Sequence, residues 1–319
     1  MLRKRTLAVA LVATLILALV ILAAGCGGAT TTTAAPSTTA APTTTAAPDT
    51  TVAPSTTAGS DTTASSVAAG KTALVLASTT STQDSGLFDV LIPAFSKAYP
   101  QYDIKVVAVG SGEALKLGQT GDADVLLVHS PAAEQDFMTA GYGVDRKAVM
   151  YNDFVIVGPT ADPAKIKGMT VAADAFKKIA DSKSLFYTRN DKSGTNAKEL
   201  TIWKAAAITP AGGWYQSTGQ GMGETLTVAD QKAGYTLTDR ATWLAKKASL
   251  TGLTLLVEGD KALFNQYHVI TCKAAKNVQG ANDFMTWIVS DDVQKNVIAP
   301  YGVDKYGQAL FIPNAATAK

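Results

Sequence analysis

The stretch that decides the fold joins the apolar run Leu185-Phe186-Tyr187 to a helix-like segment over 196–207, through the residues Arg189-Asn190-Asp191-Lys192-Ser193-Gly194-Thr195. The first turn of a helix has unpaired N–H groups and a partial positive charge. Ser193 and Thr195 add hydroxyl donors, and Gly194 lets the backbone approach a ligand closely. Arg189 supplies a full positive charge. The stretch therefore predicts either an anion site or an ordinary helix cap made by Ser193 or Asp191.

Short apolar runs alternate with helix-like segments over residues 71–319, which predicts an α/β fold with mostly parallel sheets and helices on both faces. The expected strands are 73–77, 104–109, 125–128, 154–157, 170–172, 185–187, 253–257 and 268–272. Apolar spacing predicts helix faces at Leu87, Leu91, Phe95 and Tyr99 (with a kink at Pro93), at Leu200, Trp203 and Ala207, and at Phe284, Trp287 and Ile288. In such sheets ligands bind where the carboxyl ends of strands lead into helices.

Two more loops repeat the order of strand, hydroxyl-bearing turn and helix start. The first is Ser78-Thr79-Thr80-Ser81-Thr82-Gln83-Asp84-Ser85-Gly86, and the second is Gly110-Ser111-Gly112-Glu113. Three such loops in one fold predict convergence on one anion, which backbone and hydroxyl donors would hold together with Arg189. Neutral donors and one arginine can hold a small dianion without an excess of buried cations.

Other kinds of site are not expected. The two histidines, His129 and His268, are far apart in sequence and have no neighbouring ligands, so a transition-metal site is not expected. His129 is interpreted as a structural cap or a rim residue, and His268 as structural. Asp122 and Asp124 are explained more simply by a turn and a strand start than by a cation site. The net charge is +2 and forms no basic stripe, so nucleic acid is not an expected partner.

An enzyme is also not expected. Ser111 lies in Gly110-Ser111-Gly112, which is not the Gly-x-Ser-x-Gly elbow of serine hydrolases. No nucleophile with its base and orienting group is evident. A hydrolase or phosphatase that uses the same anion pocket outside the cytoplasm stays open as the alternative.

The first 25 residues are expected to be a lipoprotein signal peptide. Arg3-Lys4-Arg5 precedes the apolar run 7–24, and Ala23-Ala24-Gly25 precedes Cys26, which is similar to the lipobox of bacterial lipoproteins. The alternative is an uncleaved membrane anchor, because the run is nearly long enough to span a bilayer. Either reading places the body outside the cytoplasmic membrane and holds it to the outer face, by a lipid on Cys26 in the first case.

Residues 26–70 are expected to be a Thr/Ala/Pro-rich disordered tether. Prolines recur every six residues, at Pro36, Pro42, Pro48 and Pro54, and the segment has too little apolar surface to offset the entropy of ordering. With lipid on Cys26, the remaining cysteine, Cys272, has no disulfide partner. Cys272 lies in an apolar run and is expected to be a small buried side chain.

Segments spread over residues 73–313 carry a resemblance to a known family. They are Ser78-Thr79-Thr80-Ser81, 83–87, 107–112, 121–129, 149–159, Ser193-Gly194-Thr195, Trp214-Tyr215, 219–223 and 235–240. Together they resemble the TupA-type tungstate-binding lipoproteins, which are substrate-binding components of ABC transporters. In that family a Thr-Thr-Thr-Ser loop and an arginine in a Ser-Arg-Gly-Asp-x-Ser-Gly-Thr-His segment hold the oxyanion. This chain departs from the pattern at Ser78, Thr188, Asn190 and Asn196.

The resemblance implies a two-lobe, type II periplasmic-binding-protein-like fold with the ligand in the cleft between the lobes. Lobe I would comprise 71–154 plus 267–319, lobe II would comprise 155–266, and the crossings would lie at 150–159 and 265–271. The loops and the resemblance together point to these ligand-binding residues: Thr79, Thr80, Ser81, Ser111, Arg189, Ser193, Gly194 and Thr195. Residues 219–223 would support the cleft wall. Arg240 would either approach the cleft or pair with Asp239.

The expected function is the capture of tungstate for an ABC-transporter permease, by a monomer that needs no cofactor. Tungstate is a fully deprotonated dianion near neutral pH and should meet only donors. Molybdate has almost the same shape and charge and stays open. Phosphate stays open too, because it carries a proton near neutral pH and would benefit from a carboxylate acceptor, for which Asp84 and Asp191 are candidates.

Overall fold

The computed structural model describes residues 70–315, so the expected signal peptide, Cys26 and nearly all of the tether lie outside the described residues. Its strands are β1 Thr72–Thr79, β2 Tyr102–Val109, β3 Val125–Val128, β4 Gly143–Pro159, β5 Phe186–Thr188, β6 Tyr215–Ser217, β7 Thr236–Asp239, β8 Leu253–Val257, β9 Phe264–Cys272 and β10 Ile312–Pro313. Its helices are α1 Thr80–Asp84, α2 Phe88–Ala98, α3 Ser111–Thr120, α4 Pro131–Thr139, α5 Ala172–Asp181, α6 Gly194–Ala205, α7 Met222–Gln231, α8 Arg240–Lys246, α9 Val278–Ile288, α10 Asp291–Val293 and α11 Val303–Tyr306. The 3₁₀ turns are η1 Lys247–Ser249 and η2 Lys261–Leu263, and η3 Gln294–Ile298 is a π-helical turn.

The main sheet has the strand order β10-β4-β9-β3-β1-β2, and β7 and β8 also pair with β4. β1 pairs in parallel with β2 and with β3, and β5 pairs in parallel with β6 in a second small sheet. The pairs made by β4 and β9 are antiparallel. Among the described strands, parallel pairing is thus concentrated where β1, β2 and β5 lead into the three predicted loops.

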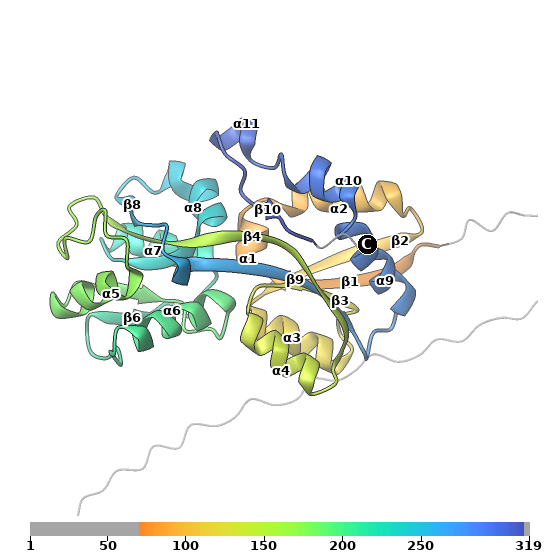
Figure 1. The fold of residues 1–319 in the computed structure, drawn as a ribbon, viewed down its shortest axis with the longest axis horizontal. Helices are drawn as coiled ribbons and strands as arrows, with labels where there is room; N and C mark the ends of the chain where they lie inside the picture. Colours follow the sequence, from red (N-terminus) through yellow and green to blue (C-terminus); the bar gives the residue numbers. More distant parts are fainter. Residues whose placement is uncertain (1–69, 316–319) are drawn as a thin grey trace, which may run out of the picture. The chain divides into compact units, whose positions relative to one another are not determined.

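The long strand β4 changes partners along its length. Residues 143–153 pair with β9, and residues 154–159 pair with β7 and β8. Figure 1 shows β4 and β9 running side by side across this part of the fold. The sequence predicted only the second part as a strand. The first part is half-exposed and carries the charged residues Asp145, Arg146 and Lys147, because an antiparallel strand can keep one face in water.

Three details of the sequence prediction were wrong. Residues 170–172 do not form a strand; Val171 caps the start of α5. Leu200 does not belong to the buried face of α6, because its side chain is 49% exposed. Ala207 lies beyond the end of α6 and has a positive φ of 55°. The buried face of α6 includes Glu199 instead, a polar residue that apolar spacing cannot reveal.

The predicted faces of α2 and α9 are confirmed. Phe95 of α2, which contains Pro93, packs edge-on against Phe284 and Trp287 of α9, with ring centroids 5.1 and 5.2 Å apart. A second cluster centres on Trp203 of α6, Phe176 and Phe186. Cys272 is buried, as predicted, and burial raises the pKa of its thiol to about 12, which keeps the sulfur protonated.

Among residues 70–315, no helix combines the length and the apolar character that a membrane crossing requires. The same part of the chain contains no group of three or more acidic, histidine or cysteine side chains placed to hold a metal ion.

Asp124 ties three elements together. Its carboxylate accepts hydrogen bonds from the backbone N–H of Val75 in β1 and of Asn277 at the start of α9, both at 2.8 Å. The side chain is 3% exposed, so these bonds are shielded from water. Asp124 therefore has a structural role at the start of β3, in agreement with its interpretation from the sequence.

We expect Asp124→Ala to lower the free energy of unfolding by about 2–4 kcal/mol, because two buried amide donors would lose their acceptor. Asp122→Ala is the matched control, since the Asp122 side chain is 58% exposed and should matter by less than about 0.5 kcal/mol. Urea denaturation followed by circular dichroism measures both. Equal losses in the two variants would contradict the assigned role of Asp124.

Candidate anion-binding site

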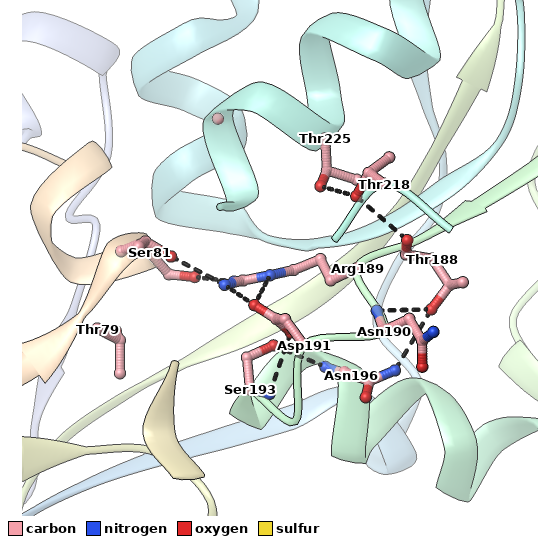
Figure 2. Close-up of polar contacts among 12 residues, drawn as sticks. Thr79, Ser81, Thr188, Arg189, Asn190, Asp191, Ser193, Asn196, Thr218 and Thr225 are labelled. Carbon is pink, nitrogen blue, oxygen red and sulfur yellow. Dashed lines mark hydrogen bonds and ion pairs between the residues drawn. The ribbon is translucent and has the colours of Figure 1, made fainter. Parts of the chain in front are cut away.

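The Arg189 guanidinium joins two of the predicted loops. Its Nη2 donates to Thr80 Oγ1 at 2.9 Å and its Nη1 to Ser81 Oγ at 3.3 Å, and both hydroxyls belong to α1. Figure 2 shows the arginine extending from the end of β5 toward α1. The Arg189 side chain is only 2% exposed. The structure therefore brings the first and third loops together around a buried cation.

Asp191 neutralises this cation. Its Oδ2 accepts from Arg189 Nε at 3.0 Å and from Nη2 at 2.6 Å, and its Oδ1 accepts from the Ser193 backbone N–H at 3.1 Å. The carboxylate thereby fixes the plane of the guanidinium and turns its Nη1/Nη2 edge toward α1. The pair carries no net charge, so an anion at this place would meet oriented dipoles rather than an excess of positive charge.

The second loop packs directly against the third. A Cβ on Gly112 would lie 2.9 Å from the Lys192 carbonyl oxygen, and a Cβ on Gly110 would lie 3.3 Å from the Asp191 carbonyl oxygen. These close approaches require glycine at Gly112 and favour it at Gly110. They bring the first turns of α3 and α6 near one another.

Two hydroxyls at these helix starts lack partners. Within residues 70–315, Ser111 Oγ and Thr195 Oγ1 are the buried side-chain polar atoms that make no hydrogen bond. Ser111 begins α3 and Thr195 lies in the first turn of α6. Buried polar atoms are nearly always paired, so two unpaired hydroxyls at adjacent helix starts point to a missing acceptor.

The remaining predicted residues have structural partners. Thr79 caps α1 by accepting from the Thr82 N–H at 3.2 Å, and Ser193 caps α6 by accepting from the Asn196 N–H at 3.2 Å. In Figure 2, Thr79 lies apart from the contacts of Arg189. Gly194 packs against His129, whose carbonyl oxygen would be 2.6 Å from a Cβ at that position. The cap interpretation thus holds for Ser193, while Asp191 binds the arginine and the Ser193 amide.

A buried polar network close to the site was not predicted. His129 Nδ1 lies 3.0 Å from Asn265 Oδ1, and Asn265 Nδ2 donates to Asn152 Oδ1 at 2.7 Å. Asn152 of β4 and Asn265 of β9 face each other across the strand pair, just before β4 changes partners. Burial lowers the pKa of His129 to about 4, so its ring is neutral near pH 7. This pairing appears only once the register of β4 and β9 is known.

The other charged residues near the predicted loops have hydrogen-bond partners other than Arg189. Arg240 binds Asp153 and Glu258, each at 2.6 Å, so it neither reaches Arg189 nor pairs with Asp239. Asp239 caps α8 instead. Asp84 accepts from the Gly223 N–H at the start of α7 at 2.9 Å, and burial raises the pKa of its carboxyl.

The cavity that His129 and Gly194 help to line is a different place from the candidate site. It measures about 770 Å³ and lies between α4, α6 and β9, with His129 and Gly194 in its wall. Arg189, Ser111 and Thr195 do not line it. A tetrahedral oxyanion needs far less volume than this cavity offers. We therefore place the candidate site at the unpaired hydroxyls of Ser111 and Thr195 rather than in this cavity.

We expect Thr195→Val to leave the free energy of unfolding of the ligand-free protein within about 0.5 kcal/mol of the parent, because the hydroxyl it removes has no partner. Thr79→Val makes the same change at a hydroxyl that caps a helix, and it should cost about 1 kcal/mol. Urea unfolding curves of both variants measure the difference. A loss at Thr195 as large as that at Thr79 would show that the Thr195 hydroxyl is paired.

Comparison with known proteins places the chain in a family. The PBP superfamily domain matches residues 30–292. The tungstate-binding protein TupA of Peptoclostridium acidaminophilum is 50% identical over 252 residues, which cover 77% of this chain and 87% of the relative. The tungstate-binding protein TupA of Campylobacter jejuni is 41% identical over 247 residues, covering 75% and 90%.

Solved structures agree. The tungstate ABC transporter structure from Geobacter sulfurreducens is 44% identical, covers 70% of this chain and 97% of its own, and has a TM-score of 0.64. The tungstate-binding protein TupA from Desulfovibrio alaskensis is 46% identical, covers 77% and 100%, and has a TM-score of 0.62. The predicted α/β fold of type II periplasmic-binding proteins is confirmed. The chain belongs to the PBP superfamily and, within it, to the TupA family of ABC-transporter solute-binding proteins.

Proposed function

We propose that this protein captures tungstate outside the cytoplasmic membrane and delivers it to an ABC-transporter permease. The proposal rests on the buried Arg189 guanidinium that donates to Thr80 and Ser81, together with the unpaired hydroxyls of Ser111 and Thr195 at two adjacent helix starts. Two relatives, 50% and 41% identical to this chain, bear the name tungstate-binding protein. The ligand would accept hydrogen bonds from the two hydroxyls that have no partner in the protein.

The donor set suits a tetrahedral dianion. Hydroxyl groups, the first turns of α3 and α6, and Arg189 all present hydrogens, and tungstate is fully deprotonated near neutral pH. The starts of helices add partial positive charge. Because Asp191 already balances Arg189, the anion would be held mainly by oriented dipoles. Molybdate offers the same oxygens and charge, so it should bind as well.

Phosphate is disfavoured by its proton. Near neutral pH it carries a hydroxyl that needs an acceptor in the site. Both oxygens of Asp191 already accept, from Arg189 and from the Ser193 N–H, and Asp84 accepts from Gly223 at the start of α7. A phosphate hydroxyl would therefore compete with donors that already engage both carboxylates.

A hydrolase with the same pocket is disfavoured by the surroundings of its hydroxyls. A serine or threonine nucleophile needs a hydrogen-bonded base. Within residues 70–315, Ser111 Oγ and Thr195 Oγ1 have no hydrogen-bond partner at all. Binding without chemistry, and without a cofactor, is therefore the simpler function for this site.

The proposed capture involves two lobes, 71–154 plus 267–319 and 155–266. Thr80, Ser81 and Ser111 belong to the first lobe, and Arg189 and Thr195 belong to the second, so a bound anion would hold the lobes together. The buried Asn152–Asn265 pair would lie at the crossings between them. We further propose a monomer that is lipid-anchored through Cys26 to the outer face of the membrane.

We expect Arg189→Ala to weaken tungstate binding by about 30-fold or more, because it removes a buried, hydrogen-bonded charge. Isothermal titration of the full chain in detergent solution measures the dissociation constant. Arg240→Ala is the matched control, since Arg240 is engaged with Asp153 and Glu258, and its affinity should stay within about threefold of the parent. Parental affinity in Arg189→Ala would exclude the proposed site.

We expect tungstate and molybdate to bind, and phosphate to bind at least about 100-fold more weakly, because an isolated buried acceptor or donor costs a few kcal/mol. Competition titrations at pH 7.5 compare the three anions on one preparation. Phosphate affinity equal to that of tungstate would mean that a carboxylate of this site accepts the phosphate proton.

A further inference from the structure

A carboxyl group buried behind the anion site takes no part in the contacts described so far. Glu199 of α6 is 2% exposed. Its Oε1 accepts hydrogen bonds from Trp203 Nε1 at 3.0 Å and from Tyr215 Oη at 2.7 Å. None of the ion pairs formed within residues 70–315 includes Glu199. The group is therefore a buried acid without a cationic partner.

Glu199 is coupled to the binding loop by its position. It lies on the helix whose first turn holds Gly194 and Thr195. It also interacts with Thr188, the residue that precedes Arg189. The Thr188 hydroxyl in turn accepts from the Asn190 N–H at 3.2 Å and from Asn196 Nδ2 at 3.3 Å, as Figure 2 shows.

Glu199 populates both its protonated and its ionised form near pH 7. Burial is the largest cause that raises its pKa, to about 7, and the negative charge of Asp191 acts in the same direction. Hydrogen bonds from Thr188, Tyr215 and Trp203 favour the ionised form and limit the rise.

The titratable groups that face Glu199 are Tyr215 from β6 and Asp191 from the loop after β5. Its neighbours Trp203 on α6 and Thr188 on β5 do not titrate. Burial and Glu199 itself raise the pKa of Tyr215, so the phenol stays protonated and remains a donor near neutral pH.

We propose that Glu199 takes up one proton from solvent when a dianion binds beside Arg189 and releases it when the anion leaves, which makes the affinity of the site depend on pH. This inference rests on the proposed function. An anion that contacts Arg189 would lie next to Asp191, whose single charge already acts on Glu199. A ligand with two negative charges would act in the same direction.

The direction of the pH dependence follows from the linkage between proton binding and anion binding. The anion raises the pKa of Glu199, so binding favours the protonated form. At pH values well below about 7, Glu199 is protonated with or without ligand, and the affinity does not change with pH. As the pH rises through the pKa of the free protein, binding must also take up a proton, and the dissociation constant increases. It levels off above the pKa of the complex, after a total increase of about tenfold for each unit of pKa shift.

Titration of the full chain with sodium tungstate between about pH 6 and pH 8.5 tests this proposal. We expect the dissociation constant of the parent, divided by that of Glu199→Gln, to rise by about 3- to 10-fold over this range. Protonation of tungstate itself cancels in this ratio. Asp136→Asn, an exposed change on α4, is the control and should follow the parent at every pH.

Proton uptake gives an independent readout. Titrations near pH 7.5 in two buffers of different ionisation enthalpy should show that the parent takes up more protons on binding than Glu199→Gln. Tyr215→Phe removes a donor to the ionised carboxylate, so it should move the midpoint of the affinity change to higher pH. This second variant keeps the test decisive if Glu199→Gln does not fold.

A constant affinity ratio and equal proton uptake in parent and Glu199→Gln would overturn the proposal, as would an unchanged midpoint in Tyr215→Phe. The absence of tungstate binding at every pH would instead overturn the proposed function. The two failures are thus distinguishable.

Discussion

The ion pair between the buried Arg189 and Asp191 is the interaction on which the candidate site depends. A guanidinium that is almost fully removed from water requires a partner, because an unpaired buried charge is very costly. Asp191 supplies that partner two residues away and also accepts from the backbone of the turn that starts α6. One carboxylate therefore shapes the loop, balances the charge and aims the arginine at α1.

The fold brings the other groups to this pair. Parallel pairing of β1 with β2 places the first two loops at the same edge of the sheet, and β5 delivers the third. β4 and β9 connect the part of the sheet that contains β1–β3 with the part that contains β7 and β8. Side chains from distant parts of the sequence can thus face one small volume, while helix starts supply donors that carry no net charge.

Sequence reasoning found the local features and missed the long-range ones. The three loops, the arginine and the helix starts are local patterns, and the resemblance to a family added the fold. The pairing of Asp191 with Arg189 was not predicted, because a carboxylate near a helix start serves equally well as a cap. The Asn152–Asn265 pair depends on strand register. Glu199 was not predicted to be buried, because apolar spacing does not reveal a polar residue on the buried face of a helix. The same apolar spacing led to the wrong prediction that Leu200 is buried.

The hydroxyl groups of Thr80 and Ser81 have a consequence for how quickly an anion could occupy the candidate site. A hydroxyl that accepts a hydrogen bond through a lone pair can still donate its own hydrogen. Both oxygens already accept from Arg189, so the two hydrogens remain available to an incoming oxyanion. Only rotation about two C–O bonds is needed to aim them, while the heavy atoms stay in place. The proposed capture would then involve little rearrangement of side chains, and its speed would be set by diffusion and by the proposed closure of the two lobes.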